Sequence, residues 1–593
     1  MNRRNKGTRI IGAVILAGCM LLNASACGKV QETGNETEAS SAGGSDVMGQ
    51  TEASAGTGTA GSVDGSPRTE VSGQKEEGSG EPAKDISGDG PSLMRDVCLK
   101  HRYDNEWRDN QYSLLNYDYE QIFFPESLEA LYPKLTPKLY IINDLIATEE
   151  SNCRMKALAE TQKLSDEEVK EAGDKGTLPR RGQWRIYVRR ADSEVFSLVA
   201  RTALESPGKG DHVTYRCSNL RSGTGEDISL SDVVLDEDAF CSLIAEKANE
   251  TASGAAGNGN KTELTGAEIK AHLDGSPGGN WTLDPQGVSV WFGSDAISPE
   301  DACVSVLYAE DTGGGIFKED VIRSSPRTWT MYFPLSLKTR FDADEDGKAD
   351  LLTVNEKRDR YEEGGYEYCT GLTMDYNGRQ QEFADWDELY EIRLSLIHMY
   401  GETFLLNECR EYEYSMMDIY ALSKDSVIDT GSIYGSPVTL SEVKLPEDEY
   451  IYPDCLLTDP ESIRVSTMTD MLSTCGSERD YVLRETGRFE PVEPWYVIND
   501  PSRYTITPLV WLKDVPVVDE STHEVTSERV TLRPGDRITM EYTDDSTYSD
   551  CRTQDGKLVR IEVHSDDEFG RYVLSGDQKV EVFKAFDDMM FAG

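Results

Sequence analysis

Apolar and polar residues follow two different periods along the first folded part of the chain. In the segment 132–162, apolar residues recur every three or four positions, which predicts an amphipathic helix. The apolar residues at this spacing are Leu139, Ile142, Leu145 and Ile146. In the segment 184–204, the period is two on either side of a polar turn at Arg190–Ser193, so we expect two strands there.

The same region continues as a mixture of helix and strand. The segment 228–250 reads as a short strand, an acidic turn and a helix, and 281–292 reads as a hairpin that turns at Pro285–Gly287. Another apolar run at 302–311 predicts a strand. This mixture indicates an α+β domain.

Beyond residue 328 the pattern is mostly that of strands. The segment 402–423 predicts two adjacent strands, and Pro534–Gly535 and Asp555–Gly556 mark turns in the last ninety residues. We therefore expect an α+β protein with a mixed N-terminal domain and a mainly β C-terminal region. A propeller-like blade and a small SH3-like barrel are the expected β architectures.

The N-terminus has the pattern of an export signal. A basic stretch ends at Arg9, and an apolar run too short for a membrane span follows it. The small residues Ala24, Ser25 and Ala26 then precede Cys27, which resembles the lipobox of bacterial lipoproteins. The resemblance implies a diacylglyceryl group on Cys27, which anchors the protein to the outer face of the cell membrane. Cys19, which follows a similar motif, and an ordinary cleaved signal remain the alternatives.

The stretch from residue 28 to 92 is rich in Gly, Ser, Thr, Glu and Ala and almost lacks large apolar residues. Such a composition cannot bury enough surface to fold, and predicts a flexible linker. The expected organisation is a lipoprotein signal peptide at 1–27, a linker at 28–92, an α+β domain at 93–328, a β-rich domain at 329–505 and a small β domain at 506–593.

The net charge and the spacing of the cysteines argue against several classes of function. The net charge of −48, from 108 acidic and 60 basic residues, disfavours nucleic acid as a partner. Ten cysteines follow Cys27, but none forms a CxxC pair, so no zinc or thioredoxin-like site is indicated. An even number of cysteines in an exported protein permits disulfides, but their dispersed positions in apolar runs favour buried free thiols.

The region 93–325 resembles a known extracytoplasmic domain. The order of its segments, the Ser229–Val233 motif and the Leu283–Val288 hairpin are similar to the domain shared by the lysozyme-sensing anti-sigma factor RsiV and the peptidoglycan deacetylase PdaC. A stretch around His212 replaces a motif that is common in that family. The resemblance implies an envelope-facing recognition domain of unknown function.

The stretch "DADEDGKAD" at 342–350 places aspartates at alternate positions before a glycine. Calcium takes six to eight oxygen ligands, and alternate carboxylates around a tight Gly turn can supply several of them. The predicted Ca²⁺ ligands are Asp342, Asp344, Asp346, Asp350 and the carbonyl of Lys348. Thr353 replaces the glutamate of an EF-hand, and strands flank the loop, so the pattern resembles the loops of integrin-type propeller blades. The alternative is a solvated acidic hairpin.

No GxSxG, HExxH or GxxxxGK[ST] motif is present. We therefore expect a lipid-anchored, non-catalytic binding or sensing protein of the cell envelope, with a cell-wall glycan or a muramidase as its ligand and structural Ca²⁺. The alternative is a cell-wall hydrolase or deacetylase whose site is assembled from scattered acids. Trp107, Tyr112, Tyr117 and Tyr119 could stack on sugars, but core packing is the simpler explanation.

Overall fold

The structure of the protein is a computed structural model. It describes residues 91–590 except for 109–111, 175–177, 179, 207–209, 256–262, 276–278, 295, 297–300, 312, 361–366, 384–390, 411–414, 425, 440–453 and 568–569. The chain divides into two units, Met1–Lys84 and Asp85–Gly593. The predictions for the signal peptide, Cys19, Cys27 and the linker up to residue 90 lie outside the described residues.

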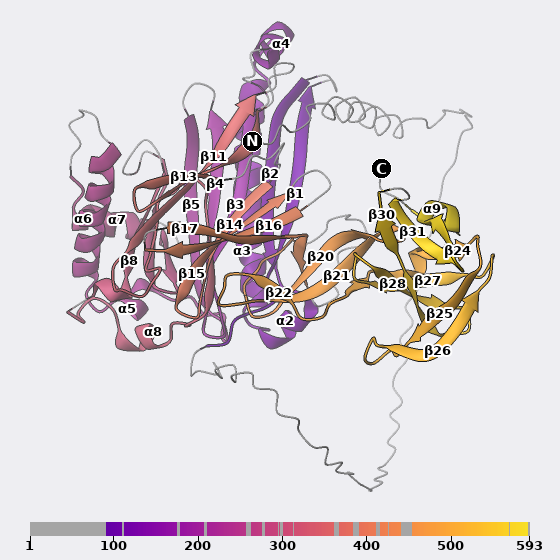
Figure 1. Ribbon diagram of the computed structural model, residues 1–593. Helices are drawn as coiled ribbons and strands as arrows, with labels where there is room; N and C mark the ends of the chain where they lie inside the picture. The colour runs from indigo at the N-terminus through magenta and orange to yellow at the C-terminus, as the bar shows by residue number, and fades with distance from the viewer. Residues whose placement is uncertain are drawn as a thin grey trace, which may run out of the picture. The chain divides into compact units, whose positions relative to one another are not determined.

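A six-stranded sheet in the order β19-β1-β2-β3-β4-β5 carries the long helix α3 on one face (Figure 1). The strands are β1 (Cys98–Arg108), β2 (Tyr112–Phe123), β3 (Arg180–Ala191), β4 (Val195–Ser206), β5 (Gly210–Arg221) and β19 (Asp454–Cys455), and the helices are α2 (Glu126–Leu131), α3 (Thr136–Thr161) and α4 (Asp166–Asp174). The helical spacing buries Leu139, Ile142 and Ile146 against the sheet. Leu145 was predicted on the same apolar face but is 43% exposed.

Three short strands and two helices form a second core. The strands β6 (Trp281–Asp284), β7 (Gly287–Phe292) and β8 (Ala302–Leu307) pair in order, and α6 (Glu237–Ala255) packs against β8 and α7 (Gly266–Asp274). The predicted hairpin between β6 and β7 is confirmed, with a two-residue turn at Pro285–Gln286. Gly287 is required there, because a Cβ at this position would lie 2.2 Å from the Val306 carbonyl oxygen.

The strand predicted at the start of the 228–250 segment is wrong. This part of the chain forms a short helix, α5 (Leu230–Val233), because Ser229 and Asp232 make a capping box at its start. Two further one-turn helices, η1 (Tyr308–Glu310) and α8 (Glu319–Arg323), follow β8.

A five-stranded sheet, β17-β16-β15-β14-β9, lies between two other layers. Its strands are β9 (Trp329–Phe333), β14 (Glu391–Met399), β15 (Glu402–Arg410), β16 (Ser415–Ser423) and β17 (Ser426–Tyr434). Leu394, Leu396 and Leu405 pack on a four-stranded sheet of β10 (Thr339–Phe341), β11 (Asp350–Arg360), β12 (Glu367–Tyr376) and β13 (Arg379–Phe383). Ile397 and Phe404 face the opposite way, toward residues of β20 (Ile463–Asp470) and β21 (Thr474–Leu483). Because both faces of this sheet are buried, the sequences of these strands are nearly continuous apolar runs.

The remaining strands belong mainly to a twelve-stranded sheet. They are β18 (Ser436–Val438), β20 (Ile463–Asp470), β21 (Thr474–Leu483), β22 (Phe489–Pro491), β23 (Tyr496–Ile498), β24 (Thr505–Pro508), β25 (Leu512–Val518), β26 (Val525–Leu532), β27 (Ile538–Thr543), β28 (Tyr548–Thr553), β29 (Leu558–Glu562) and β33 (Phe586–Asp587). This region is completed by a three-stranded sheet of β30 (His564–Asp566), β31 (Gly570–Ser575) and β32 (Gln578–Glu581), by the helix α9 (Val582–Ala585) and by the short 3₁₀-helix η2 (Pro501–Arg503).

The small SH3-like barrel expected at 506–593 is not formed, since the described strands include no closed barrel. The reason is the pairing of β27 with β23, which extends the sheet toward β20 and β21 instead of closing it. The predicted hairpin at Asp555–Gly556 does join β28 to β29, and Gly556 has the positive φ of 87° that the turn requires. With 19% helix and 52% strand, the α+β class is confirmed and β structure dominates.

Candidate functional site

The aspartate loop connects two antiparallel neighbours, β10 and β11. This is the strand–loop–strand context that the flanking sequence predicts. Glu345 and Gly347 have positive φ values of 56° and 81°, so the backbone turns sharply between the first and last aspartates. This turn brings carboxylates that are eight residues apart in the sequence to the same side of the loop.

Three of the predicted ligands converge. One carboxylate oxygen from each of Asp342, Asp344 and Asp350 lies within 4.8 Å of the others. Asp342 is buried, and its two oxygens accept hydrogen bonds from the N–H groups of Asp346 and Gly347, at 3.1 and 2.9 Å. These three residues could hold a divalent cation, because aspartate oxygens are the ligands that Ca²⁺ prefers.

The fourth predicted carboxylate, that of Asp346, is placed differently. The Asp346 carboxylate lies 3.2 Å from Lys348 Nζ and 3.1 Å from Lys424 Nζ. The hydrogen bonds to these two lysines lower the pKa of Asp346. The structure therefore brings together three of the four predicted carboxylates and turns the fourth toward two lysines.

Residues from outside the loop fix its first half. The side-chain amide of Gln286, in the β6–β7 turn, donates to the Asp342 carbonyl at 2.8 Å and accepts from the Asp342 N–H at 2.9 Å. The Thr403 hydroxyl donates to the Ala343 carbonyl at 2.9 Å. His398 Nε2 lies 3.2 Å from Glu345 Oε1. The loop is therefore held in place by side chains of β14, β15 and the β6–β7 turn.

The second half of the loop is fixed by β12 and the turn after it. Asn377 donates to Asp350 Oδ1 at 2.7 Å. Tyr376 is 2% exposed, and its hydroxyl lies beside the Asp350 carboxylate. Burial raises the pKa of Tyr376 far above its usual value, and the charges of Asp350 and Asp344 raise it further. Tyr376 and Asn377 therefore fix the orientation of the Asp350 carboxylate at the end of the loop.

The charges of the loop are unbalanced. Burial raises the pKa of Asp342, and the neighbouring Asp346 and Asp344 raise it further, although two backbone N–H groups oppose the shift. Between residues 342 and 350, five acidic side chains stand against one lysine. A bound cation would reduce this repulsion.

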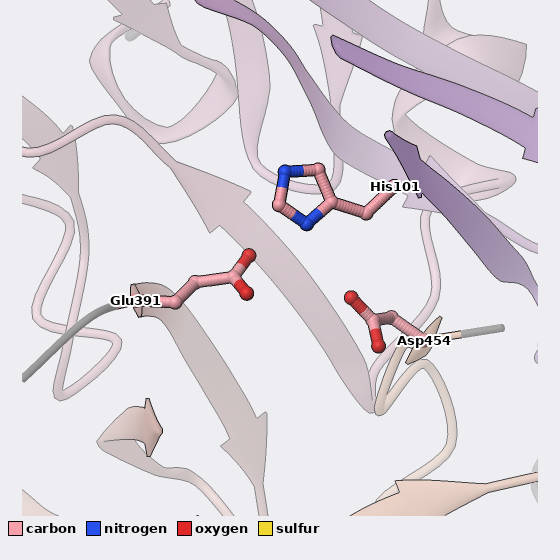
Figure 2. Close-up of side chains that lie close together, drawn as sticks. All are labelled: His101, Glu391 and Asp454. Atoms are coloured by element: carbon pink, nitrogen blue, oxygen red, sulfur yellow. The ribbon is translucent and has the colours of Figure 1, made fainter. Parts of the chain in front are cut away.

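A second cluster of charged side chains was not predicted. His101 of β1, Glu391 of β14 and Asp454 of β19 point toward a common centre, and one ligand atom from each lies within 4.8 Å of the others (Figure 2). By residue type, this set could also hold a metal ion.

Arginines occupy most of the carboxylate oxygens in this cluster. Arg185 lies 3.1 Å from Glu391, 3.0 Å from Glu120 and 2.8 Å from Asp118. Arg393 contacts Glu120 at 2.9 Å and Glu391 at 3.3 Å, and Arg410 pairs with Asp454. We call these residues the charge network; its members are His101, Asp118, Glu120, Arg185, Glu391, Arg393, Arg410 and Asp454.

The charge network is nearly neutral. Its four carboxylates face three guanidinium groups, and a proton on His101 would balance them. Burial alone would raise the pKa of Glu391, but Arg393, Arg185 and Arg410 lower it to about 2. Burial alone would lower the pKa of His101, but Asp118, Glu391 and Glu120 raise it above its usual value, against the opposing charge of Arg185. Because three guanidinium groups already compensate these carboxylates, the network suits a role in joining strands better than a metal site.

A groove of about 620 Å³ runs along α3, β5 and the segment 227–231. Ile141 and Leu145 of α3 line it and are 54% and 43% exposed. Lys138 and Arg216 lie on its border and pair with Asp227 and Glu149. The groove therefore offers exposed aliphatic side chains with charged groups around them.

The remaining residues singled out in the sequence are dispersed. Tyr117 is buried in the core under α3, as expected, whereas Trp107 is 52% exposed on the sheet edge. His212 is exposed on β5, and His398 is buried beside the aspartate loop. Among the described residues, no two histidines meet in one candidate metal cluster.

No family model matches the chain, and no curated protein matches it. Among solved structures, the chain is similar to a DUF3298 family member from Bacteroides fragilis, with 9% identity and a TM-score of 0.24 over 40% of this chain and 99% of the other. It is also similar to a DUF3298 family protein from Pseudomonas aeruginosa, with 13% identity and a TM-score of 0.24 over 40% of this chain and 98% of the other. The likeness to RsiV and PdaC stays a prediction. Among the described helices, none is both long and apolar enough to cross a bilayer.

Proposed function

We propose that the protein is a non-catalytic binding protein of the cell envelope, held at the outer face of the membrane by a lipid on Cys27 and stabilised by Ca²⁺ in the loop 342–350. The lipobox-like sequence supports the anchor, and the convergence of Asp342, Asp344 and Asp350 supports the calcium. The role of calcium is structural, because the loop is fastened to neighbouring strands by Gln286 and Thr403.

The groove along α3 is the observation that carries the binding function. Ile141 and Leu145 are exposed, and a partner that covers them would stabilise the complex by roughly 25 cal/mol per Å² of apolar surface removed from water. The exposed apolar side chains of the groove are aliphatic, and Trp281, which also lines it, is only 3% exposed, so the groove suits a protein ligand better than a glycan stacked on an aromatic ring. The net charge of −48 favours a basic partner. We therefore favour a basic secreted protein, such as a muramidase, over a wall glycan.

The proposal is tested by binding of the chain to lysozyme and, in a parallel arm, to purified wall fragments. We expect lysozyme to bind, and the double variant Ile141→Asp, Leu145→Asp to weaken binding about tenfold or more, because losing two interface anchors costs more than about 1.4 kcal/mol. Met155→Asp is the matched control, since Met155 is 59% exposed on the same helix but does not line the groove. Equal binding by both variants would contradict the role of the groove. Binding only to wall fragments would reassign the ligand.

A further inference from the structure

Two cysteines that are distant in the sequence meet beside the charge network. The Sγ atoms of Cys98 and Cys455 are 3.0 Å apart, and both residues are buried. Cys98 begins β1, and Cys455 ends β19. This separation is well inside the usual contact distance of two sulfur atoms, so no other side chain lies between them.

The strand pairing sets the two side chains face to face. Cys98 is directly opposite Cys455 in the antiparallel ladder. The Leu456 N–H donates to the Val97 carbonyl at 2.8 Å, so the adjacent pair, Cys98 and Cys455, is a non-hydrogen-bonded pair. In such pairs the Cα atoms are about 4.5 Å apart and the side chains lie close together. That separation is within the range of about 4.4 to 6.8 Å found in disulfides.

We propose that Cys98 and Cys455 form a disulfide that fastens β19 to β1 in the exported protein. The bond forms by thiol–disulfide exchange with a disulfide oxidant. The thiolate of one cysteine attacks the oxidant and releases one of its thiols, which gives a mixed disulfide. The thiolate of the other cysteine then attacks the protein sulfur and releases the second thiol. The two cysteines lose two protons and two electrons, and the oxidant gains them.

Because both thiols are buried in the folded protein, we expect the disulfide to form during folding. Cys98 is 0% exposed and Cys455 is 4% exposed, so an oxidant reaches them before β19 has docked. The contact with Cys98 and burial both raise the pKa of Cys455 well above its usual value, which leaves little thiolate in the folded, reduced state. We therefore expect oxidation to accompany folding, and the finished bond to resist reductants.

The disulfide would fix β19, the short strand that carries Asp454 of the charge network. β19 has two residues and pairs with β1 at two positions only, so the ladder alone holds it weakly. Asp454, beside Cys455, belongs to the charge network and pairs with Arg410. The disulfide would close a loop between residues 357 positions apart and keep Asp454 in contact with the strands β14 and β15.

The experiment uses the full chain from two sources, one exported by cells and one refolded from denaturant in a buffer of oxidised and reduced glutathione. The protein is unfolded in denaturant that contains N-ethylmaleimide, so that buried free thiols are also blocked, and it is then digested without reduction. We expect a peptide pair joined through Cys98 and Cys455, with a mass about 2 Da below the sum of the two free peptides. Reduction should separate the pair.

Cys98→Ser should abolish the cross-link, and Cys153→Ser, at a half-buried position on α3, should retain it. The wild-type peptide map does not depend on either variant, so a variant that fails to fold leaves the test intact. N-ethylmaleimide on both Cys98 and Cys455 in the wild-type protein from both sources would overturn the proposal.

Discussion

At the scale of single residues, the surroundings of each carboxylate decide its role. Asp342 is buried among backbone N–H groups, Asp346 lies against two lysines, and Glu391 is surrounded by arginines. The pKa of the first is raised, while those of the other two are lowered. A carboxylate is thus available for a cation in one place and already compensated in the other two.

Asp344 converges with Asp342 and Asp350, whereas Asp346 faces two lysines, so we expect substitutions of these two aspartates to affect calcium binding unequally. Wild-type protein should gain about 2.7 kcal/mol of unfolding free energy when free Ca²⁺ is a hundredfold above its dissociation constant. Asp344→Asn removes a converging ligand, and a tenfold weaker site would gain only about 1.4 kcal/mol. Asp346→Asn, the matched control, should retain most of the gain, because its carboxylate faces Lys348 and Lys424.

The measurement is thermal unfolding of each protein in millimolar Ca²⁺ and in chelator. Identical melting of the wild type in both conditions would leave the loop as a solvated acidic turn. An equal loss in both variants would place Asp346 among the ligands.

Glu391 should stabilise the fold in a defined pH range. Its folded pKa of about 2 lies below its usual value, so its contribution is present above the unfolded pKa of about 4.3 and is lost as the pH falls toward 2. A difference of this size is worth on the order of 3 kcal/mol. We expect the unfolding free energy of the wild type, measured in urea, to fall between about pH 5 and pH 2 by this amount more than that of Glu391→Gln. Parallel curves for the two proteins would contradict the assignment.

At the scale of elements, the β6–β7 turn and the aspartate loop depend on each other. Gln286 makes two hydrogen bonds to the backbone of Asp342, and its position is set by the tight turn before Gly287. The element that carries the candidate ligands is therefore oriented by a hairpin some fifty residues earlier in the chain.

Substitution of Gln286 tests this dependence. Gln286→Ala leaves the N–H and the carbonyl of Asp342 without these partners, which should cost about 1–3 kcal/mol of unfolding free energy. It should also weaken the response to Ca²⁺, because the first ligand is no longer held. Gln381→Ala, on the exposed part of β13, should leave both quantities unchanged. Urea unfolding with and without Ca²⁺ measures the two effects, and a full calcium response in Gln286→Ala would refute the coupling.

At the scale of the whole molecule, the charge network joins strands from three distant parts of the sequence. Arg393 of β14 contacts Glu120 of β2 and lies 3.7 Å from Asp454 of β19. Its side chain is 10% exposed, and its removal would leave the four largely buried carboxylates of the charge network facing only two guanidinium groups, those of Arg185 and Arg410.

Arg393→Met should therefore destabilise the protein by about 3–5 kcal/mol. Arg323→Met is the control, because Arg323 and Glu319 form an exposed ion pair, and such pairs contribute about 0–1 kcal/mol. Urea unfolding of both variants measures the difference. A loss below about 1 kcal/mol for Arg393→Met would show that the network does not hold the strands together.

Local patterns were sufficient to predict several elements. The helical spacing of Leu139, Ile142 and Ile146 and the turn residues at 285–286 and 555–556 act over a few positions, and α3 and both hairpins follow them. The aspartate loop was also visible in the sequence, because its candidate ligands lie within nine residues. The short helix α5 was missed, since the capping box of Ser229 and Asp232 outweighed the strand-like pattern.

The sequence by itself determined the α+β class, the acidic charge and the presence of a compact group of aspartates. Only the tertiary structure decided which three carboxylates converge, that Gln286 and Tyr376 lie beside them, and that Cys98 meets Cys455. It also decided the charge network and the continuation of the C-terminal sheet through β23. The physical reason is distance along the chain: hydrophobic period and turn chemistry act between near neighbours, whereas strand pairing and ion pairs join residues whose separation leaves no local pattern.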